Sequence, residues 1–323
     1  MFLLALAAVA ALSKAPLFAT QDLPLHGNTL RLIVTGDAGA THSRLLQGML
    51  RVHGAKPVDA ILLVGDNFYP CGIASTADPQ WSKITEHFVP LHIPIYAILG
   101  NHDYGDPQIR GSSLWTCGSP DPEAELEETQ IPEWHFPART YALHSPLVDI
   151  IMLDTQPIAS GLAQSFRGSA TSAEIKSFLN EQLIASHAAW RLVAGHHTIY
   201  SSGMHGRTND YERANMRALL PFLENGTTGA DLYICGHDHD LELIGDRDGR
   251  ARPLFLISGA ASGLDQMKVR HHGVEPATLF PHPIEAFFGF AVLEIQPATL
   301  TITFYDERGT QRGFPFKLTQ RLR

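Results

Sequence analysis

Short apolar runs that end in polar, metal-binding side chains recur along this chain. Residues 32–34, 61–64 and 232–234 are continuous apolar runs, a pattern typical of strands buried on both faces of a sheet. Five polar patches follow such runs: Gly36-Asp37-Ala38-Gly39, Gly65-Asp66-Asn67-Phe68-Tyr69, Gly100-Asn101-His102-Asp103, Gly195-His196-His197 and Gly236-His237-Asp238-His239. In an open α/β sheet, ligands bind beyond the carboxyl ends of the strands, so the pattern predicts that the five patches meet at one rim.

Strand and helix patterns alternate through the first half of the chain. Strands are expected immediately before Asp37, Asp66 and Asn101, and helices over residues 43–52 and 79–88. Pro79 near the first turn suits the start of the second helix. This strand–helix–strand order favours a parallel sheet.

The second half of the chain becomes mostly β. Apolar residues at helical spacing predict a helix over residues 172–190. Strands are expected over residues 148–153, 191–194, 253–257, 288–295 and 300–305. We found no internal repeat, and the polar patches are spread along the whole pattern. The elements therefore predict a mixed α/β fold in a single domain over residues 28–320.

Residues 105–133 lack any apolar periodicity and are predicted to form a long surface loop. The segment is rich in Gly, Ser and Pro and contains the acidic run 121–128. Long loops in compact domains are often lids or binding loops, and this one starts directly after a polar patch. It is therefore expected to border a substrate entrance, or else to be a solvated insertion.

The N-terminal segment has a different character from the rest. Residues 2–12 form a short apolar run that resembles the core of a secretory signal, and the run is too short to span a bilayer. A positively charged start is missing, so a plain apolar helix is the alternative. We predict a signal peptide or an apolar N-terminal segment over residues 1–20, no stable membrane insertion, and a secreted or periplasmic location.

Composition narrows the class of partner. The chain has 323 residues, of which 44% are hydrophobic and 18% are charged, so it can bury a large core. Its formal net charge of -9 argues against a nucleic-acid or anionic-membrane binder, because such proteins cluster Lys and Arg. An anionic substrate would need local positive charge, which metal ions supply. The sequence carries no signal for an oligomeric state.

Three cysteines allow at most one intramolecular disulfide. Cys71 and Cys117 lie in Gly/Pro/Ser-rich segments beside the polar patches. Cys235 ends an apolar run and is expected to be a buried thiol. A Cys71–Cys117 disulfide is a hypothesis that agrees with export.

The ordered patches resemble those of the calcineurin-like metallophosphoesterases. Tyr69, three residues after Asp66, makes the chain similar to purple acid phosphatases, above all to the small tartrate-resistant type. Further likeness lies in Trp134-His135-Phe136-Pro137, Leu153-Asp154-Thr155, His205-Gly206 and Ser258-Gly259-Ala260. The resemblance implies a four-layer α/β/β/α sandwich of two mixed β-sheets flanked by helices, with a dinuclear metal centre.

The resemblance also implies a set of seven ligands. One ion would be bound by Asp37, Asp66, Tyr69 and His239, and the other by Asp66, Asn101, His196 and His237, with Asp66 as the bridge. Two carboxylates and a phenolate suit Fe³⁺, whereas two imidazoles and an amide suit a divalent ion such as Fe²⁺, Zn²⁺ or Mn²⁺. Taken alone, Tyr69 would be as easily explained as an aromatic that fills a loop.

Two further histidines are candidates for catalysis. His102 and His205 match the non-ligand histidines that the family places beside the substrate, where they would protonate the leaving group. Asp103 is expected to orient His102. A purely structural role for His102 and a solvated loop for His205 are the alternatives. His197 is expected to be a wall residue and not a ligand.

The function expected from the resemblance is that of an acid phosphatase. It would hydrolyse small phosphate monoesters with a metal-bound hydroxide as nucleophile, because Fe³⁺ acidifies bound water more strongly than a divalent ion does. A phosphodiesterase or nucleotide pyrophosphatase with the same metals is the first alternative. A secreted metal-binding protein without turnover is the second.

Overall fold

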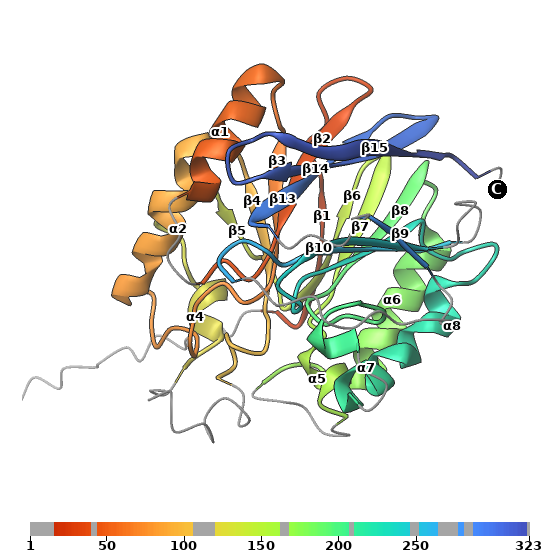
Figure 1. Ribbon diagram of the computed structural model, residues 1–323. Helices are drawn as coiled ribbons and strands as arrows, with labels where there is room; N and C mark the ends of the chain where they lie inside the picture. Colours follow the sequence, from red (N-terminus) through yellow and green to blue (C-terminus); the bar gives the residue numbers. More distant parts are fainter. Residues whose placement is uncertain are drawn as a thin grey trace, which may run out of the picture.

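The computed structural model of the protein describes residues 16–39, 44–105, 120–161, 168–206, 210–245, 252–263, 277–280 and 287–321. Within these residues, two β-sheets pack face to face and helices lie on the two outer faces (Figure 1). One apolar core fills the space between the sheets and extends under the helices on one side, and a second core lies under the helices on the other. The expected four-layer sandwich is therefore confirmed.

The seven-stranded sheet has the order β15-β14-β13-β2-β3-β4-β5. Its strands are β2 (Leu30–Thr35), β3 (Ala60–Val64), β4 (Ile95–Ile98), β5 (Trp134–His135), β13 (Gly289–Ile295), β14 (Thr299–Asp306) and β15 (Gln311–Thr319). β2 to β5 pair in parallel, and β13 to β15 pair antiparallel. The apolar runs that predicted parallel strands are β2, β3 and β4, and every residue in them is buried.

The eight-stranded sheet has the order β1-β6-β7-β8-β9-β11-β10-β12. Its strands are β1 (Phe18–Asp22), β6 (Thr140–His144), β7 (Val148–Met152), β8 (Trp190–Ala194), β9 (Leu232–Cys235), β10 (Leu241–Gly245), β11 (Leu254–Ser258) and β12 (Ala277–Phe280). β1 starts inside residues 1–20, which we predicted to be a signal peptide or an apolar N-terminal segment. It pairs in parallel with β6, so it belongs to the sheet. Residues 1–15 lie outside the described ranges, so the signal peptide stays a prediction.

Helices cover the outer face of each sheet. α1 (Arg44–Ala55) and α2 (Ser82–His87) lie over the seven-stranded sheet, while α5 (Gln156–Ala159), α6 (Ser172–Ala185), α7 (Tyr211–Met216) and α8 (Leu220–Leu223) lie over the other sheet (Figure 1). The helix predicted over residues 172–190 ends earlier, at Ala185, because Ser186 has an extended backbone. In the described part of the chain, we found no helix with the length and apolar character that crossing a membrane requires.

The prediction of a surface loop is wrong for residues 120–133. Residues 120–133 contain the short helix α4 (Glu123–Leu126), and the side chain of Glu125 is fully buried. One of its carboxylate oxygens accepts a hydrogen bond from Nδ2 of Asn67 at 2.9 Å, and its backbone oxygen accepts one from the Trp134 indole at 2.8 Å. The acidic run was therefore mistaken for a solvated surface. Residues 106–119 lie outside the described ranges, so their proposed role at the entrance stays a prediction.

The two cysteines that the structure describes differ in their bonding, as expected. Cys235 is a buried free thiol, and Cys71 is disulfide-bonded. Cys117 lies outside the described residues, so its pairing with Cys71 stays a hypothesis.

Candidate metal centre

The carboxyl ends of five parallel strands meet at one rim, where the two sheets come together. β2, β3 and β4 lead to Asp37, Asp66 and Asn101, whereas β8 and β9 of the other sheet lead to His196 and His237. A hydrogen bond joins the two sheets at this rim: the backbone N–H of His237 donates to Oδ2 of Asp37 at 3.0 Å. The polar patches of the sequence therefore converge as predicted.

Three of these residues have a strained backbone. Asp37, Asp66 and His237 have φ angles of 59°, 54° and 71°, in the left-handed region that residues with a side chain rarely adopt. Such conformations cost about 1–3 kcal/mol each and are found mainly where function requires them. The turn after each strand therefore places its polar side chain at some cost in stability.

The first set of converging side chains surrounds the hydroxyl group of Tyr69. The hydroxyl oxygen lies 3.0 Å from Oδ1 of Asp37, 2.9 Å from Oδ2 of Asp66 and 3.0 Å from Nε2 of His239. The phenol has only one proton, so it can donate to one of its three neighbours at a time. At least one carboxylate oxygen is therefore left close to the phenol oxygen without the phenol proton between them. We call these residues the phenol set.

The second set surrounds Nε2 of His196. This atom lies 3.0 Å from Oδ1 of Asn101, 3.4 Å from Oδ1 of Asp66 and 3.2 Å from Nδ1 of His237. The side chains of His196 and Asp66 are almost completely buried. We call these residues the imidazole set.

Asp66 belongs to both sets. Its Oδ2 faces Tyr69 and its Oδ1 faces His196. Oxygen and nitrogen atoms of Asp37, Asp66 and His196 lie within 4.8 Å of one another, which is the spacing of side chains that can share metal ions. The structure thus brings all seven predicted ligands together, and it places Asp66 where a bridging carboxylate would be needed.

Hydrogen-bond donors of the imidazole set point away from its centre. Nδ1 of His196 lies 2.9 Å from the carbonyl oxygen of Val64, which can only accept, so the neutral ring presents a lone pair at Nε2. Nε2 of His237 lies 3.2 Å from a carboxylate oxygen of Glu212, so its Nδ1 presents a lone pair as well. When both rings are neutral, two nitrogen lone pairs and two side-chain oxygens face one another. A cation between them would turn this repulsion into attraction, so the residues fit a metal ion.

The buried carboxylates require positive charge nearby. Burial raises the pKa of Asp66, but the charges of His196 and His102 hold this pKa well below its usual value. Burial lowers the pKa of His196, yet Asp66 and Asp37 raise it to about 10. Burial and the same two carboxylates raise the pKa of Tyr69 well above its usual value. With the side chains alone, protons balance the carboxylates, and metal ions would displace those protons.

His102 lies beside the phenol set. Its ring centroid is 4.2 Å from that of Tyr69, and its Nε2 lies 3.8 Å from Oδ2 of Asp66. Nδ1 lies 2.6 Å from the carbonyl oxygen of Pro70, so this carbonyl orients the ring. The expectation that Asp103 orients His102 is wrong. Asp103 is buried and instead accepts the backbone N–H groups of residues 67, 68 and 100.

His205 lies beside the imidazole set. The centroid of its ring is 3.8 Å from that of His237, and its Nδ1 lies 3.2 Å from a carboxylate oxygen of Asp210. Its backbone N–H donates to Asp238 at 3.0 Å, which fixes the loop that carries it. Burial lowers the pKa of His205, but the hydrogen bond with Asp210 and the charge of Asp238 raise it above its usual value. Each set therefore has one candidate proton donor.

His197 is a buried neighbour of the centre. Its Nδ1 lies 2.8 Å from the hydroxyl oxygen of Thr155, and its ring packs 4.7 Å from that of His237. Burial and the charge of His237 lower its pKa well below the usual value. The ring therefore stays neutral and packs as a wall of the site, in agreement with the sequence-based expectation.

Two acidic residues near the centre were missed from the sequence. Asp210 caps the N-terminus of α7, and Glu212 lies in its first turn with a buried side chain. An acid before a short helix is the usual mark of an N-cap, so neither acid indicates a role at the centre from the sequence alone. The weak signal was the distance of only a few residues between His205 and both acids.

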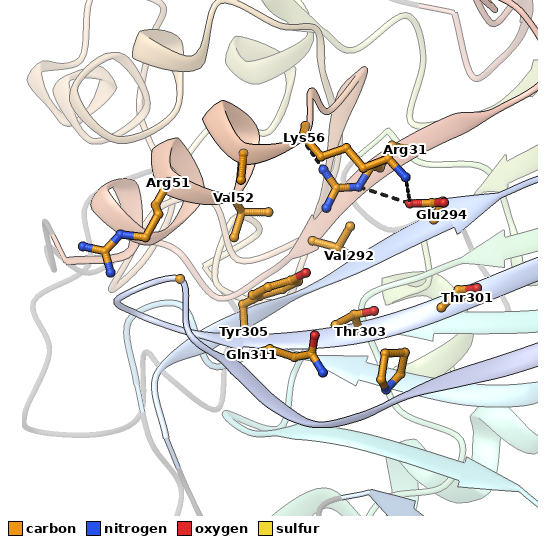
Figure 2. Close-up of a pocket in the computed structure, with 13 residues that line it drawn as sticks. Arg31, Arg51, Val52, Lys56, Val292, Glu294, Thr301, Thr303, Tyr305 and Gln311 are labelled. Atoms are coloured by element: carbon orange, nitrogen blue, oxygen red, sulfur yellow. Dashed lines mark hydrogen bonds and ion pairs between the residues drawn. The ribbon is translucent and has the colours of Figure 1, made fainter.

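The pocket in Figure 2 is separate from this centre. It has a volume of about 570 Å³ and lies between α1 and strands β13 to β15. Three of its charged groups are paired, because Nζ of Lys56 and Nε of Arg31 both approach the Glu294 carboxylate, the latter at 3.6 Å (Figure 2). Arg31 stands at the start of β2, whereas the metal centre lies beyond its end. We therefore assign the chemistry to the rim and not to this pocket.

Sequence comparisons agree with this geometry. A family model described as calcineurin-like phosphoesterase matches residues 30–241. Purple acid phosphatase 7 of Arabidopsis thaliana is 30% identical, over 87% of this chain and 84% of the relative. Tartrate-resistant acid phosphatase type 5 of Homo sapiens is 28% identical, over 91% of this chain and 92% of the relative.

Solved structures share the fold. GAP50, described as the anchor in the inner membrane complex of Plasmodium, has a TM-score of 0.68 at 22% identity, over 91% of this chain and 90% of that one. The purple acid phosphatase PPD1 from yellow lupin seeds has a TM-score of 0.58 at 13% identity, over 91% of this chain and 54% of that one. At these identities the likeness shows the architecture alone.

Proposed function

The chain belongs to the calcineurin-like phosphoesterase family and, within it, to the purple acid phosphatases, and from this we propose that it hydrolyses phosphate monoesters at the seven-residue centre. It is a metal-dependent hydrolase with a dinuclear centre. One observation carries the proposal for this site: the two oxygens of Asp66 face two separate sets of ligands. A single ion would not need a carboxylate in that position.

We assign different ions to the two sets. The phenol set brings together two carboxylates and a phenol, whose loss of a proton would give three anionic oxygens that suit Fe³⁺. The imidazole set offers two neutral nitrogens and an amide oxygen besides the bridge, which suits Fe²⁺, Zn²⁺ or Mn²⁺. When bound, the pair supplies positive charge to the phosphoryl group and lowers the pKa of water enough for hydrolysis in acid.

We assign protonation of the leaving group to His102 or His205. Nδ1 of His102 is held by a backbone carbonyl, so its Nε2 is the atom that faces the centre. Nδ1 of His205 is held by Asp210, so this ring also has Nε2 as its available nitrogen. We propose that one of the two donates a proton from Nε2 to the departing alkoxide.

A combined measurement tests the proposal. Purified protein supplied with iron and zinc is analysed for metal content, for visible absorption and for hydrolysis of chromogenic monoesters and diesters between pH 4 and pH 8. We expect two metal ions per chain, a phenolate-to-iron band, and faster turnover of monoesters below neutral pH. Faster turnover of diesters would favour the phosphodiesterase alternative. Two bound ions without turnover of any ester would favour the non-catalytic alternative.

We also propose that the protein is exported to a secreted or periplasmic location. The disulfide at Cys71 supports this, because disulfides persist mainly in oxidising compartments. The N-terminal sequence and mass of protein recovered from the producing cell and its medium give the test. Protein that is found only inside the cell with reduced Cys71 would contradict it.

A further inference from the structure

Glu212 lies in the first turn of α7, and its carboxylate reaches under the imidazole set. The side chain is buried, and one oxygen lies 3.2 Å from Nε2 of His237. The same oxygen lies 3.9 Å from Nδ1 of His205. The other oxygen accepts a hydrogen bond from the Tyr211 hydroxyl at 3.3 Å. A single carboxylate therefore lies beside a predicted metal ligand and beside a candidate proton donor.

The contact with His237 determines which nitrogen of that ring is free. A carboxylate oxygen accepts hydrogen bonds, so Nε2 of His237 carries the proton that lies between them. The neutral ring then has its lone pair at Nδ1, and this atom lies 3.2 Å from Nε2 of His196. Without Glu212, both tautomers of His237 would be accessible. Only one of them places a lone pair in the imidazole set.

His197 strengthens the same arrangement. The Thr155 hydroxyl oxygen accepts the backbone N–H groups of His196 and His197 at 3.1 and 3.2 Å, so its own hydrogen is available for Nδ1 of His197. The neutral His197 ring then carries its proton on Nε2, which is buried and has no hydrogen-bond partner among the described residues. A ring nitrogen of His197 lies within 4.8 Å of atoms of Glu212 and His237. Because Nε2 is a donor, this cluster suits a carboxylate better than another cation.

We propose that Glu212 is the positioning residue of the imidazole set. It holds His237 in the tautomer and orientation that present Nδ1 to the divalent ion, and through its approach to His205 it joins this ligand to a candidate proton donor. The inference rests on the proposed function, because it assigns the divalent ion to this set. Outer partners of metal-bound histidines fix ring orientation and ligand basicity, and their removal typically weakens metal binding by about 10–100-fold.

The phenol set provides an internal reference. Tyr69 is surrounded by Asp37, Asp66 and His239, and its hydroxyl group lies on the other side of the shared carboxylate. A general loss of structure would weaken both metal sites. Loss of the Glu212 contact alone should weaken only the divalent one. The visible band of the phenol set therefore reports whether the effect is local.

The test compares Glu212→Ala with wild type and with Glu224→Ala, a change at an exposed position just beyond α8. Zn²⁺ affinity is measured by competition with a chromophoric chelator on iron-loaded protein. We expect the affinity to fall by about 10–100-fold in Glu212→Ala, to stay at the wild-type value in Glu224→Ala, and the iron–phenolate band to be unchanged in both. Excess Zn²⁺ should restore much of the lost turnover of Glu212→Ala.

A second variant tests the inference if Glu212→Ala does not fold. Glu212→Gln keeps the size of the side chain and an acceptor oxygen but loses the charge, so it should weaken Zn²⁺ binding less than Ala does. Wild-type Zn²⁺ affinity in the folded variant, whether Ala or Gln, would overturn the inference. Equal weakening of the iron band and of Zn²⁺ binding would also overturn it, because the role would then be structural. Wild-type protein that binds only one metal ion would instead refute the proposed dinuclear function.

Discussion

The phenol set and the imidazole set are two halves of one centre, and they are built on different principles. In the phenol set, oxygen atoms contact one another around Tyr69, and the side chain of His239 is 26% exposed. In the imidazole set, the histidines are buried and their far nitrogens are held by Val64 and Glu212. The comparison teaches that the first half would select its ion by charge, whereas the second half would depend on the tautomers of its rings.

Removal of the shared carboxylate should break both halves at once. Asp66→Ala deletes a side chain whose two oxygens approach Tyr69 and His196. Two-metal stabilisation contributes several kcal/mol, so we expect turnover of a chromogenic monoester to fall by about 10³-fold or more. Metal content should fall for both ions. Glu86→Ala on the exposed face of α2 is the control, and full metal content in Asp66→Ala would contradict the assignment.

Exchange of His102 should show what the phenol half contributes to proton transfer. A general acid accelerates a reaction by about 10²–10⁴-fold, and an alkyl leaving group needs its proton more than an activated aryl group does. His102→Ala should therefore reduce kcat for an alkyl phosphate much more than for an aryl phosphate. The same pair of substrates with His205→Ala tests the donor of the imidazole half. Equal losses on both substrates in a variant would exclude proton donation by that histidine.

Loss of the Tyr69 hydroxyl should separate the two halves. Tyr69→Phe keeps the ring but removes the atom that Asp37, Asp66 and His239 surround. We expect the visible band to disappear and iron to be held more weakly, while Zn²⁺ affinity stays within about tenfold of wild type. Tyr305→Phe is the matched control. A visible band of normal strength in Tyr69→Phe would show that another group causes the colour.

Acid should release the divalent ion in a graded manner. In the metal-free protein, burial lowers the pKa of His196 but Asp66 and Asp37 raise it to about 10, so below that pH the ring is protonated and the ion must displace its proton. Because one proton leaves as one ion binds, the apparent Zn²⁺ affinity should rise by about tenfold per pH unit between pH 6 and pH 9. Competition titrations at several pH values give the slope. A slope near zero would mean that His196 does not bind the ion.

A change far from both halves should leave the comparison intact. The side chain of Thr171 caps α6 and forms a reciprocal capping box with Glu174. Thr171→Ala should lower the free energy of unfolding by about 1 kcal/mol, measured by urea denaturation. Metal content and turnover should stay at wild-type values. A loss of metal in this variant would show that the centre is sensitive to general destabilisation.

Much of the fold and most of the centre could be predicted because the signal was local. Asp37, Asp66 and Asn101 follow apolar runs within a few residues, so the strands and the side chains they present are encoded together. Glu212 was missed because its partner His237 lies far away in the sequence. The role of Asp103 was predicted wrongly because its partners are backbone N–H groups. The acidic run around Glu125 was misjudged because burial with a hydrogen bond from Asn67 depends on tertiary contacts.

The centre takes ligands from both layers of strands. Asp37, Asp66, Tyr69 and Asn101 follow strands of the seven-stranded sheet, and His196, His237 and His239 follow strands of the other sheet. Each assigned ion would thus fasten one layer to the other. Any free energy of metal binding to the folded chain adds to its stability, so a chelator should lower the melting temperature as well as the activity. The catalytic ions would therefore also hold the two β-sheets together.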